Sequence, residues 1–362
     1  MSQERVTATG IIWYYPLYNN LYFDTRDRSD CPFQVLVGGR GVGKTYSALR
    51  NLLFDADGKR INPDANHKFM YMRRLAKEIE FCTSDISNPF KRINRDYHVD
   101  VRASYRKKDG YAVFYDDSST VESDEPLGYG VALSTFSGLR GVDFSDVDII
   151  IFDEFIPERQ VRKIKSEGKV FLNMYETVNR NRELQGEKPV KVLLLANSIS
   201  MGSEILLEMG AVPTMASMIL KDQHRATIKE RGLYIELIDS KKLAEVKQKT
   251  ALYRLTAGSE FNKEAIMNKF TTDNLDFAKK VKINEYKALF NFCEYTFYKH
   301  KSREEYYMAK RVDTAPIKYS GADVDILTKG FVYTYQSLLL QRRIYFDDYA
   351  TKLVFDTILK LN

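Results

Sequence analysis

A glycine-rich segment near the amino terminus has residue types and a spacing suited to binding a nucleoside triphosphate. It fits the pattern G-x-x-x-x-G-K-[ST] without a mismatch, and its members are Gly38, Gly39, Arg40, Gly41, Val42, Gly43, Lys44 and Thr45. Glycines let the backbone turn tightly enough for several amide groups to point at one phosphate chain. Lys44 offers a positive charge to the β- and γ-phosphates, and Thr45 offers a hydroxyl to Mg²⁺. The segment therefore predicts a site for ATP and Mg²⁺.

Two adjacent acids end a mostly apolar run farther along the chain. The run covers residues 147–152 and is followed directly by Asp153 and Glu154. The carboxyl end of a buried parallel strand is a common place for ligand-binding groups, so Asp153 is expected to hold Mg²⁺. Glu154 is expected to orient and deprotonate the attacking water. The pair favours hydrolysis of ATP.

Two more polar residues are expected near the terminal phosphate. Asn197 follows the apolar run 190–196, where its amide could contact the γ-phosphate and report its loss. The alternative for Asn197 is a turn-forming residue. Arg40 lies inside the glycine-rich segment, and the sequence leaves two roles open: contact with the γ-phosphate, or an ion pair with a surface acid.

The elements that must position these residues alternate along the first 200 residues. Apolar runs of strand length occur at 33–37, 68–72, 130–134, 147–152 and 190–196. Helical spacing follows the first two runs and separates the later ones. Such alternation predicts a parallel sheet with helices on both faces. The predicted fold class is thus α/β, with a P-loop NTPase domain over residues 1–200.

The pattern changes after residue 200. Residues 201–250 have mostly helical spacing, with one short strand at 233–237, and are predicted to form a linker subdomain. Residues 251–362 contain strands rich in tyrosine and phenylalanine before a helical tail, which predicts a second, α+β domain.

The composition suits a soluble globular protein. The 362 residues are 44% hydrophobic and 29% charged, with a formal net charge of +6. Three scattered cysteines lack metal or redox spacing, which favours buried thiols in a reducing compartment. Because no apolar run approaches the length of a membrane span, the protein is expected to act in a cytoplasm without a membrane partner.

Two basic clusters could contact the phosphates of DNA. The first cluster contains Arg73, Arg74 and Lys77 at the end of the second strand. The second follows Asp153 and Glu154 and contains Arg159, Arg162, Lys163, Lys165 and Lys169. Lys and Arg bind DNA phosphates without reading sequence, although a solvated surface charge is the alternative for any single residue. The second cluster is the stronger candidate, because a loop joined to the metal-binding strand would move with the nucleotide state.

With both nucleotide motifs placed, the chain resembles the DNA-packaging ATPases of small short-tailed phages, whose large relatives are the terminase subunits. The resemblance rests on FMYMRR at 69–74, LS at 133–134 before a loop with Arg140, IIFDEF at 150–155, VNRNRE at 178–183 and IYFD at 344–347. It is close over 33–200 and thin over 230–362. It implies an additional-strand (ASCE), FtsK/HerA-like P-loop ATPase that translocates double-stranded viral DNA into a preformed capsid.

The resemblance also implies residue roles and partners. Arg180 would be an arginine finger that reaches the ATP of the neighbouring subunit, and Arg140 a second basic residue presented to that neighbour. The sequence by itself offers Arg180 and Arg182 equally. The implied assembly is a homo-oligomeric ring, a pentamer, in the host cytoplasm and transiently at the portal vertex of the capsid. Whether a scaffold RNA joins it to the portal is left open.

The C-terminal region departs from the large terminases, where it is a nuclease with an RNase H-like fold. Here Asp347 and Asp348 follow a strand, whereas Glu294 and Asp323 are scattered, so no convincing acid triad is present. The resemblance therefore implies a vestigial nuclease domain over residues 251–362. Lys and Arg outnumber Asp and Glu by 16 to 9 over residues 241–311, so this region could hold DNA or a nucleic-acid-rich partner.

Two other classes of protein use the same phosphate-binding loop. A nucleic-acid helicase or recombination ATPase would separate strands and need no capsid portal. A small-molecule kinase would need a lid arginine cluster and an acceptor site, and the Asp153–Glu154 pair argues against it.

Overall fold

The computed structural model divides into two compact units, which we describe separately. It describes residues 5–7, 10–12, 31–55, 58–61, 68–117, 125–157, 161, 164–197, 201–238, 245, 248–259, 262, 277–320 and 323–358. The first unit contains Met1–Met209 and Asp222–Thr271, and the second contains Gly210–Lys221 and Thr272–Asn362. Within those described ranges, no helix combines the length and apolar character needed to span a bilayer.

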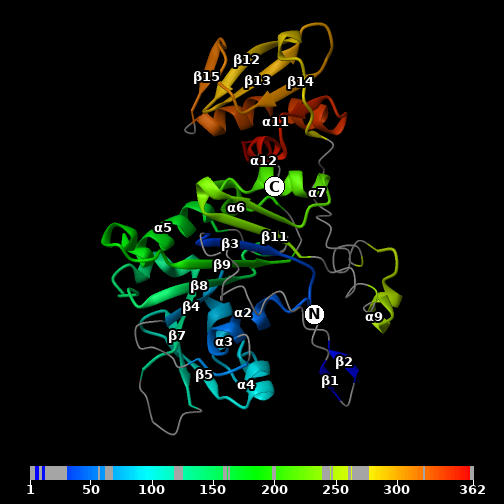
Figure 1. The fold of residues 1–362 in the computed structure, drawn as a ribbon. Helices are drawn as coiled ribbons and strands as arrows, with labels where there is room; N and C mark the ends of the chain where they lie inside the picture. The colour runs from blue at the N-terminus through cyan, green and yellow to red at the C-terminus, as the bar shows by residue number, and fades with distance from the viewer. Residues whose placement is uncertain are drawn as a thin grey trace. The chain divides into compact units, whose positions relative to one another are not determined.

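A nine-stranded sheet is the framework of the first unit, in the order β10-β11-β3-β9-β8-β4-β7-β6-β5 (Figure 1). Its strands are β3 (Phe33–Val37), β4 (Lys68–Arg73), β5 (Val101–Arg106), β6 (Tyr111–Asp116), β7 (Gly128–Ala132), β8 (Val147–Asp153), β9 (Lys191–Ala196), β10 (Arg225–Ile228) and β11 (Leu233–Leu237). The strands from β11 to β7 are parallel, as the alternating pattern predicts. Antiparallel strands extend both edges. Strands β1 (Arg5–Thr7) and β2 (Gly10–Ile12) form a separate hairpin.

Helices cover one face of this sheet with a shared apolar core. They are α2 (Lys44–Leu53), α3 (Ala76–Cys82) and α4 (Lys91–Tyr97). Leu49 of α2, Ile79 of α3 and Ile93 of α4 are buried in one cluster with Ile151 of β8 and Leu195 of β9. Alternate residues of a strand point to opposite faces, so the remaining apolar residues of these strands need a second cover.

The second cover comes from α5 (Glu167–Asn179) and α6 (Glu204–Glu208), which lie on the other side of the sheet in Figure 1. Phe152 of β8 stacks on Phe171 of α5, with 5.9 Å between ring centroids. Phe33 of β3 contacts Tyr175 of the same helix at 4.7 Å. Helices therefore lie on both faces, which confirms the predicted α/β arrangement.

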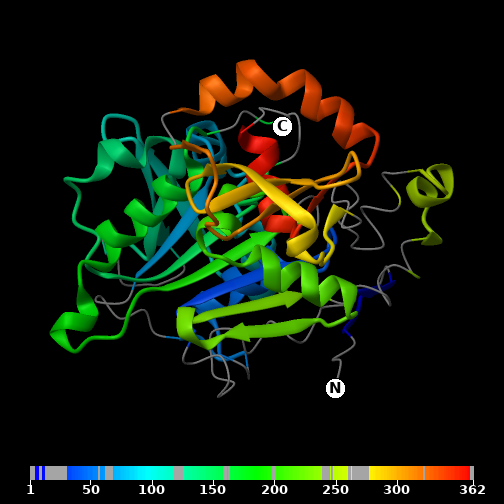
Figure 2. The same cartoon turned by 90° about the horizontal axis from the view of Figure 1, so that it is seen from above.

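The described residues between 201 and 250 do not form the separate linker subdomain that the sequence predicts. Strand β11 is the parallel neighbour of β3, and Figure 2 shows this light-green strand beside the blue one. Its residues 233–237 are buried throughout, and the strand pairs with β10 along one edge and with β3 along the other. Helix α7 (Val212–Leu220) belongs instead to the second unit. The predicted boundary at residue 200 is therefore wrong for both parts.

The second unit is built on a five-stranded mixed sheet in the order β15-β12-β13-β14-β16. Its strands are β12 (Tyr286–Phe292), β13 (Tyr295–His300), β14 (Tyr306–Ala309), β15 (Ile317–Tyr319) and β16 (Ile344–Phe346). The helices α11 (Val324–Leu340) and α12 (Tyr349–Ile358) pack on it through a core that includes Phe297, Phe346 and Phe355. The short helix α9 (Ala251–Leu255) lies in the first unit.

Candidate active site

The glycine-rich segment connects β3 to α2 at the carboxyl edge of the nine-stranded sheet. Gly41 and Gly43 have φ values of 77° and 91°, a left-handed region that favours glycine. A Cβ atom on Gly38 would lie 2.8 Å from the Cβ of Ile238, which is closer than real contacts allow. The loop therefore needs glycine both for its turns and for its packing, and it presents its backbone at the amino end of α2.

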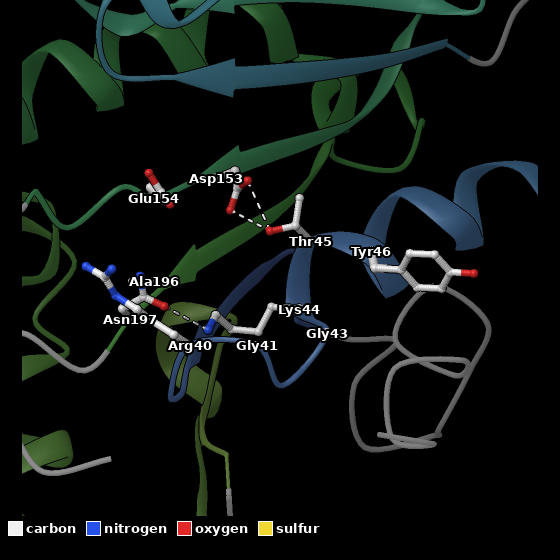
Figure 3. A pocket seen from close by; sticks show the side chains of 10 residues that line it. All are labelled: Arg40, Gly41, Gly43, Lys44, Thr45, Tyr46, Asp153, Glu154, Ala196 and Asn197. Carbon is white, nitrogen blue, oxygen red and sulfur yellow. Dashed lines mark hydrogen bonds between the residues drawn. The ribbon is translucent and has the colours of Figure 1, made fainter. Parts of the chain in front are cut away.

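Lys44 lies at the centre of this loop. Its ammonium group donates hydrogen bonds to the carbonyl oxygens of Gly38 and Gly39, at 2.8 and 3.0 Å, and to the Asn197 amide oxygen at 3.2 Å (Figure 3). Asn197 follows β9, which lies between the phosphate-loop strand β3 and the acid-bearing strand β8. The structure thus brings Asn197 to Lys44 as the strand pattern predicts, and its sensor role stays a prediction.

Asp153 meets Thr45 across the same pocket. The Thr45 hydroxyl donates to the two Asp153 carboxylate oxygens, at 3.0 and 3.1 Å (Figure 3). The Tyr71 hydroxyl of β4 also donates to Asp153, at 3.1 Å, and burial raises the pKa of Tyr71 well above its usual value. Hydroxyl and carboxylate oxygens are the donors that Mg²⁺ prefers, so this pair fits the ion. No group of three or more His, Cys, Asp or Glu side chains suited to a metal occurs among the described residues.

Glu154 turns away from its neighbour Asp153. Its φ of 53° is left-handed, and its side chain is 54% exposed. The Arg73 guanidinium donates to Glu154 at 2.6 Å, to Glu78 at 3.0 Å and to Asp153 at 3.4 Å. Burial opposes the charge of Arg73, but the surrounding acids outweigh it and raise the pKa of Arg73, so this side chain stays cationic.

The polar groups border one pocket of about 320 Å³ (Figure 3). Its lining residues are Arg40, Gly41, Gly43, Lys44, Thr45, Tyr46, Asp153, Glu154, Ala196 and Asn197. Arg40 thus borders the nucleotide pocket, which leaves both of its predicted roles open.

The sequence did not indicate two tyrosines of this site. The first is Tyr46, whose hydroxyl donates to Asp96 of α4 at 3.0 Å, and the second is Tyr71. The sequence offers only weak signals for these two tyrosines: Tyr46 directly follows the motif residue Thr45, and Tyr71 lies two residues before Arg73.

The first basic cluster is not one surface. Arg73 binds the site's acids, as described above. Arg74 is buried, and its guanidinium donates to both carboxylate oxygens of Glu167, at 2.6 and 3.0 Å. The prediction that Arg74 contacts DNA is therefore wrong, because this residue directly follows the end of β4 and turns into the protein to pair with Glu167. Lys77 is exposed on α3.

The second basic cluster is partly described. Lys165 and Lys169 are exposed, before and within the first turn of α5. Arg159, Arg162 and Lys163 lie outside the described residues. The exposed positions are compatible with contact to a polyanion, and DNA binding by this cluster stays a prediction.

The structure separates Arg180 from Arg182, which the sequence left equal. Arg180 follows the end of α5 with a left-handed φ of 45°, and its side chain is 45% exposed. Its guanidinium pairs with Asp143 at 2.9 Å. Arg182 is only 9% exposed and binds Asp148 at 3.1 Å and the Ser145 carbonyl. Only Arg180 of the two therefore presents its charge at the surface.

Arg140 lies in the segment that also carries the partner of Arg180. It is exposed directly after the short helix η2 (Leu133–Leu139), three residues before Asp143. The Ser145 amide donates to Asp143 at 3.0 Å and, with Arg180, lowers the pKa of Asp143. The ion pair thus places the Arg140 and Arg180 segments side by side.

The comparisons with known proteins agree on one family. A family model described as Podovirus DNA encapsidation protein (Gp16) matches residues 17–315. The DNA packaging protein of Bacillus phage phi29 is 27% identical over 248 residues, which are 68% of this chain and 64% of that protein. The corresponding protein of Bacillus phage B103 is 27% identical over 246 residues, 68% of this chain and 66% of that one. The matched segment spans slightly less than two thirds of these relatives.

Two solved structures share the fold over nearly the whole chain. The first, "The Phi-28 gp11 DNA packaging Motor", has a TM-score of 0.61 at 22% identity and covers 94% of this chain and 99% of its own. The second, the bacteriophage Phi-29 viral genome packaging motor assembly, has a TM-score of 0.60 at 18% identity and the same coverage. At these identities the likeness concerns the fold.

Proposed function

This chain belongs to the podovirus DNA encapsidation protein family, and we propose that it is an ATPase that drives double-stranded DNA into a preformed capsid. The observation that carries the proposal is the convergence of Lys44, Thr45, Asp153 and Glu154 on one pocket at the carboxyl edge of a parallel sheet. A glycine loop at a helix amino terminus binds phosphates, and a carboxylate beside it serves hydrolysis.

The residues of the pocket have separate tasks in this proposal. Lys44 exchanges its loop carbonyl partners for phosphate oxygens, while Asn197 stays beside it at the terminal phosphate. Thr45 and Asp153 would hold Mg²⁺, which neutralises charge that develops on the phosphates. Glu154 acts as the base when it leaves Arg73 and accepts a proton from water. The hydrogen bond from Arg73 to Glu154 therefore competes with the role of Glu154 as the base.

Arg180 would complete the site of a neighbouring copy. Arg180 and Asn181 both have left-handed φ values, 45° and 58°; this conformation is costly for arginine, whereas asparagine adopts it more readily. Backbone strain of this kind clusters at functional sites, and here it projects an exposed guanidinium. We propose Arg180 as the finger and Arg140 as a second cation at the same border of a ring, a pentamer by resemblance. Arg182 is tied to its own subunit by Asp148.

DNA contact is assigned to exposed basic residues near the catalytic strand. Lys165 and Lys169 lie between Glu154 and the body of α5, and Lys77 is exposed on α3. Exposed ammonium groups neutralise DNA phosphates without regard to sequence. The same DNA-binding role is proposed for Arg159, Arg162 and Lys163, which lie outside the described residues.

For the second unit we propose a vestigial nuclease domain of RNase H-like ancestry. Asp347 accepts the Lys310 backbone amide at 2.8 Å, and Asp348 accepts the Thr351 amide at 2.7 Å at the start of α12. Both acids thus serve local structure. The proposed partners are the capsid portal and a scaffold RNA, and the proposed location is the host cytoplasm and the portal vertex.

The proposal is tested by ATP hydrolysis in the presence and absence of duplex DNA. The expected result is Mg²⁺-dependent release of inorganic phosphate that duplex DNA stimulates, with no phosphorylated product. Lys44→Ala is expected to abolish nucleotide binding, because Lys44 supplies the only ammonium group among the described residues that line the pocket. Transfer of phosphate to an acceptor, or turnover indifferent to DNA, would contradict the motor.

A further inference from the structure

We propose that Tyr71, a core residue of β4, is a positioning residue for the Mg²⁺-binding carboxylate of Asp153. The inference rests on the proposed nucleotide site and adds a residue that belongs to neither nucleotide motif. The Tyr71 hydroxyl donates to one carboxylate oxygen, Oδ2, at 3.1 Å, while the Thr45 hydroxyl lies 3.0 Å from Oδ1 and 3.1 Å from Oδ2. Donors from two different elements therefore restrain the rotation of this carboxylate.

The backbone places Tyr71 for this contact. Strands β4 and β8 are parallel neighbours in which Tyr71 pairs with Ile151. Because side chains alternate along a strand, Ile151 and Asp153 lie on the same face as the Tyr71 ring. The ring extends along β8 so that its hydroxyl meets a carboxylate two residues farther on.

The Tyr71 ring is held rigidly. Tyr71 is 2% exposed and belongs to the same buried cluster as Ile79 and Cys82. It meets Phe114 edge to face, with 6.3 Å between centroids and an angle of 87°. A closely packed ring cannot leave without opening the core, so the hydroxyl is a fixed donor in an otherwise adaptable site.

Arg73 contacts the same carboxylate in a different way. Its guanidinium is 3.4 Å from Asp153, and it is shared with Glu154 and Glu78 on a side chain that is 17% exposed. A cation beside Asp153 competes with Mg²⁺ for the negative charge. The neutral Tyr71 hydroxyl orients Asp153 without cancelling that charge. Groups that orient a metal ligand in this way typically change metal affinity about 10–100-fold when removed.

The test is Tyr71→Phe, which removes one oxygen atom and keeps the ring. Tyr129→Phe is the matched control, because the Tyr129 hydroxyl of β7 donates to Asp146 at 2.9 Å, away from the lining of the nucleotide pocket. Binding of a fluorescent ATP analogue is followed as Mg²⁺ is added, and again in EDTA. Mn²⁺ binding in the presence of ATP, followed by electron paramagnetic resonance, gives a second readout that needs no turnover.

Tyr71→Phe is expected to raise the Mg²⁺ concentration for half-saturation about tenfold, while nucleotide affinity in EDTA stays at the wild-type value. Tyr129→Phe is expected to leave both values unchanged, and thermal melting in metal-free buffer checks that both variants fold. An unchanged Mg²⁺ and Mn²⁺ dependence would overturn the role of Tyr71. An equal loss of binding in EDTA would also overturn it, because the residue would then only support the fold. Absence of Mg²⁺-dependent ATP binding by the wild type would contradict the proposed function itself.

Discussion

The two sheets of this chain use strand-end acids differently. In the nine-stranded sheet, Asp153 ends β8 and receives hydrogen bonds from Thr45 of α2 and Tyr71 of β4, so one carboxylate joins three distant elements. In the five-stranded sheet, Asp347 and Asp348 follow β16 and accept backbone amides. An acid on which side chains from several elements converge can bind a ligand, whereas an acid satisfied by backbone amides stabilises a turn.

The largest expected effect on ATP turnover comes from comparing two exposed Arg–Asp pairs, one in each unit. Arg180→Ala is expected to lower DNA-stimulated ATP turnover about 10³-fold, because an arginine finger stabilises transition-state charge. Arg311 is the control, since it pairs with Asp313 at 2.7 Å on the second unit and its side chain is 50% exposed, close to the 45% of Arg180. Arg311→Ala is expected to leave turnover within about twofold, as surface ion pairs contribute little. If Arg180→Ala and Arg311→Ala lowered steady-state ATP turnover equally, Arg180 would have no special role in hydrolysis.

The strand-end acids provide the next comparison. Glu154→Gln is expected to keep ATP binding and to lower single-turnover hydrolysis about 10²-fold or more, because the amide cannot accept a proton from water. Asp347→Asn is the control in the five-stranded sheet and is expected to hydrolyse ATP normally. Normal turnover by Glu154→Gln would remove this residue from the mechanism.

Two buried ion pairs, one in each unit, allow the same comparison for the free energy of unfolding. Both Glu167 oxygens bind Arg74, so Glu167→Gln strands a buried guanidinium and is expected to cost about 3 kcal/mol of unfolding free energy. Asp356 of α12 binds Lys352 through one oxygen, while its Oδ1 has no hydrogen-bond partner among the described residues. Asp356→Asn should therefore cost much less. Denaturant unfolding measures both, and a larger loss for Asp356→Asn would contradict the reasoning.

The smallest expected effect is a pH dependence at Asp356. Burial raises its pKa above the usual 3.8, against the opposing effect of Lys352. The folded state therefore binds a proton more readily than the unfolded state, and this carboxyl contributes more stability as pH falls through its raised pKa. The stability of wild type relative to Asp356→Asn is expected to increase from pH 7 towards pH 4. A constant difference in unfolding free energy would mean that the pKa is not raised.

Much of the nucleotide site could be predicted from the sequence. Lys44, Thr45, Asp153 and Asn197 follow or precede apolar runs, and the carboxyl ends of parallel strands share one edge, so their convergence follows from the pattern. The roles of Arg73 and Arg74 could not be read from charge alone. Arg73 ends β4 and reaches the site's acids, whereas Arg74, directly after the strand, pairs with Glu167, which lies 93 residues away.

The domain organisation was less predictable. Residues 233–237 have the composition of a buried strand, but periodicity carries no information about which strand is the neighbour. Their pairing with residues 33–37 joins segments about 200 residues apart along the chain and places Ile238 against Gly38. Long-range pairing of this kind overrides a boundary drawn from local composition.

The most direct test of the central claim, a site completed by a neighbouring copy, mixes two inactive variants. Glu154→Gln retains Arg180, and Arg180→Ala retains Glu154, so in a mixed assembly some sites have both groups. DNA-stimulated ATP hydrolysis by the mixture is predicted to rise well above the sum of the separate variants. If the activity of the mixture stays at that sum, Arg180 either acts on the ATP of its own subunit or takes no part in hydrolysis. Either result would contradict a site shared between neighbouring copies.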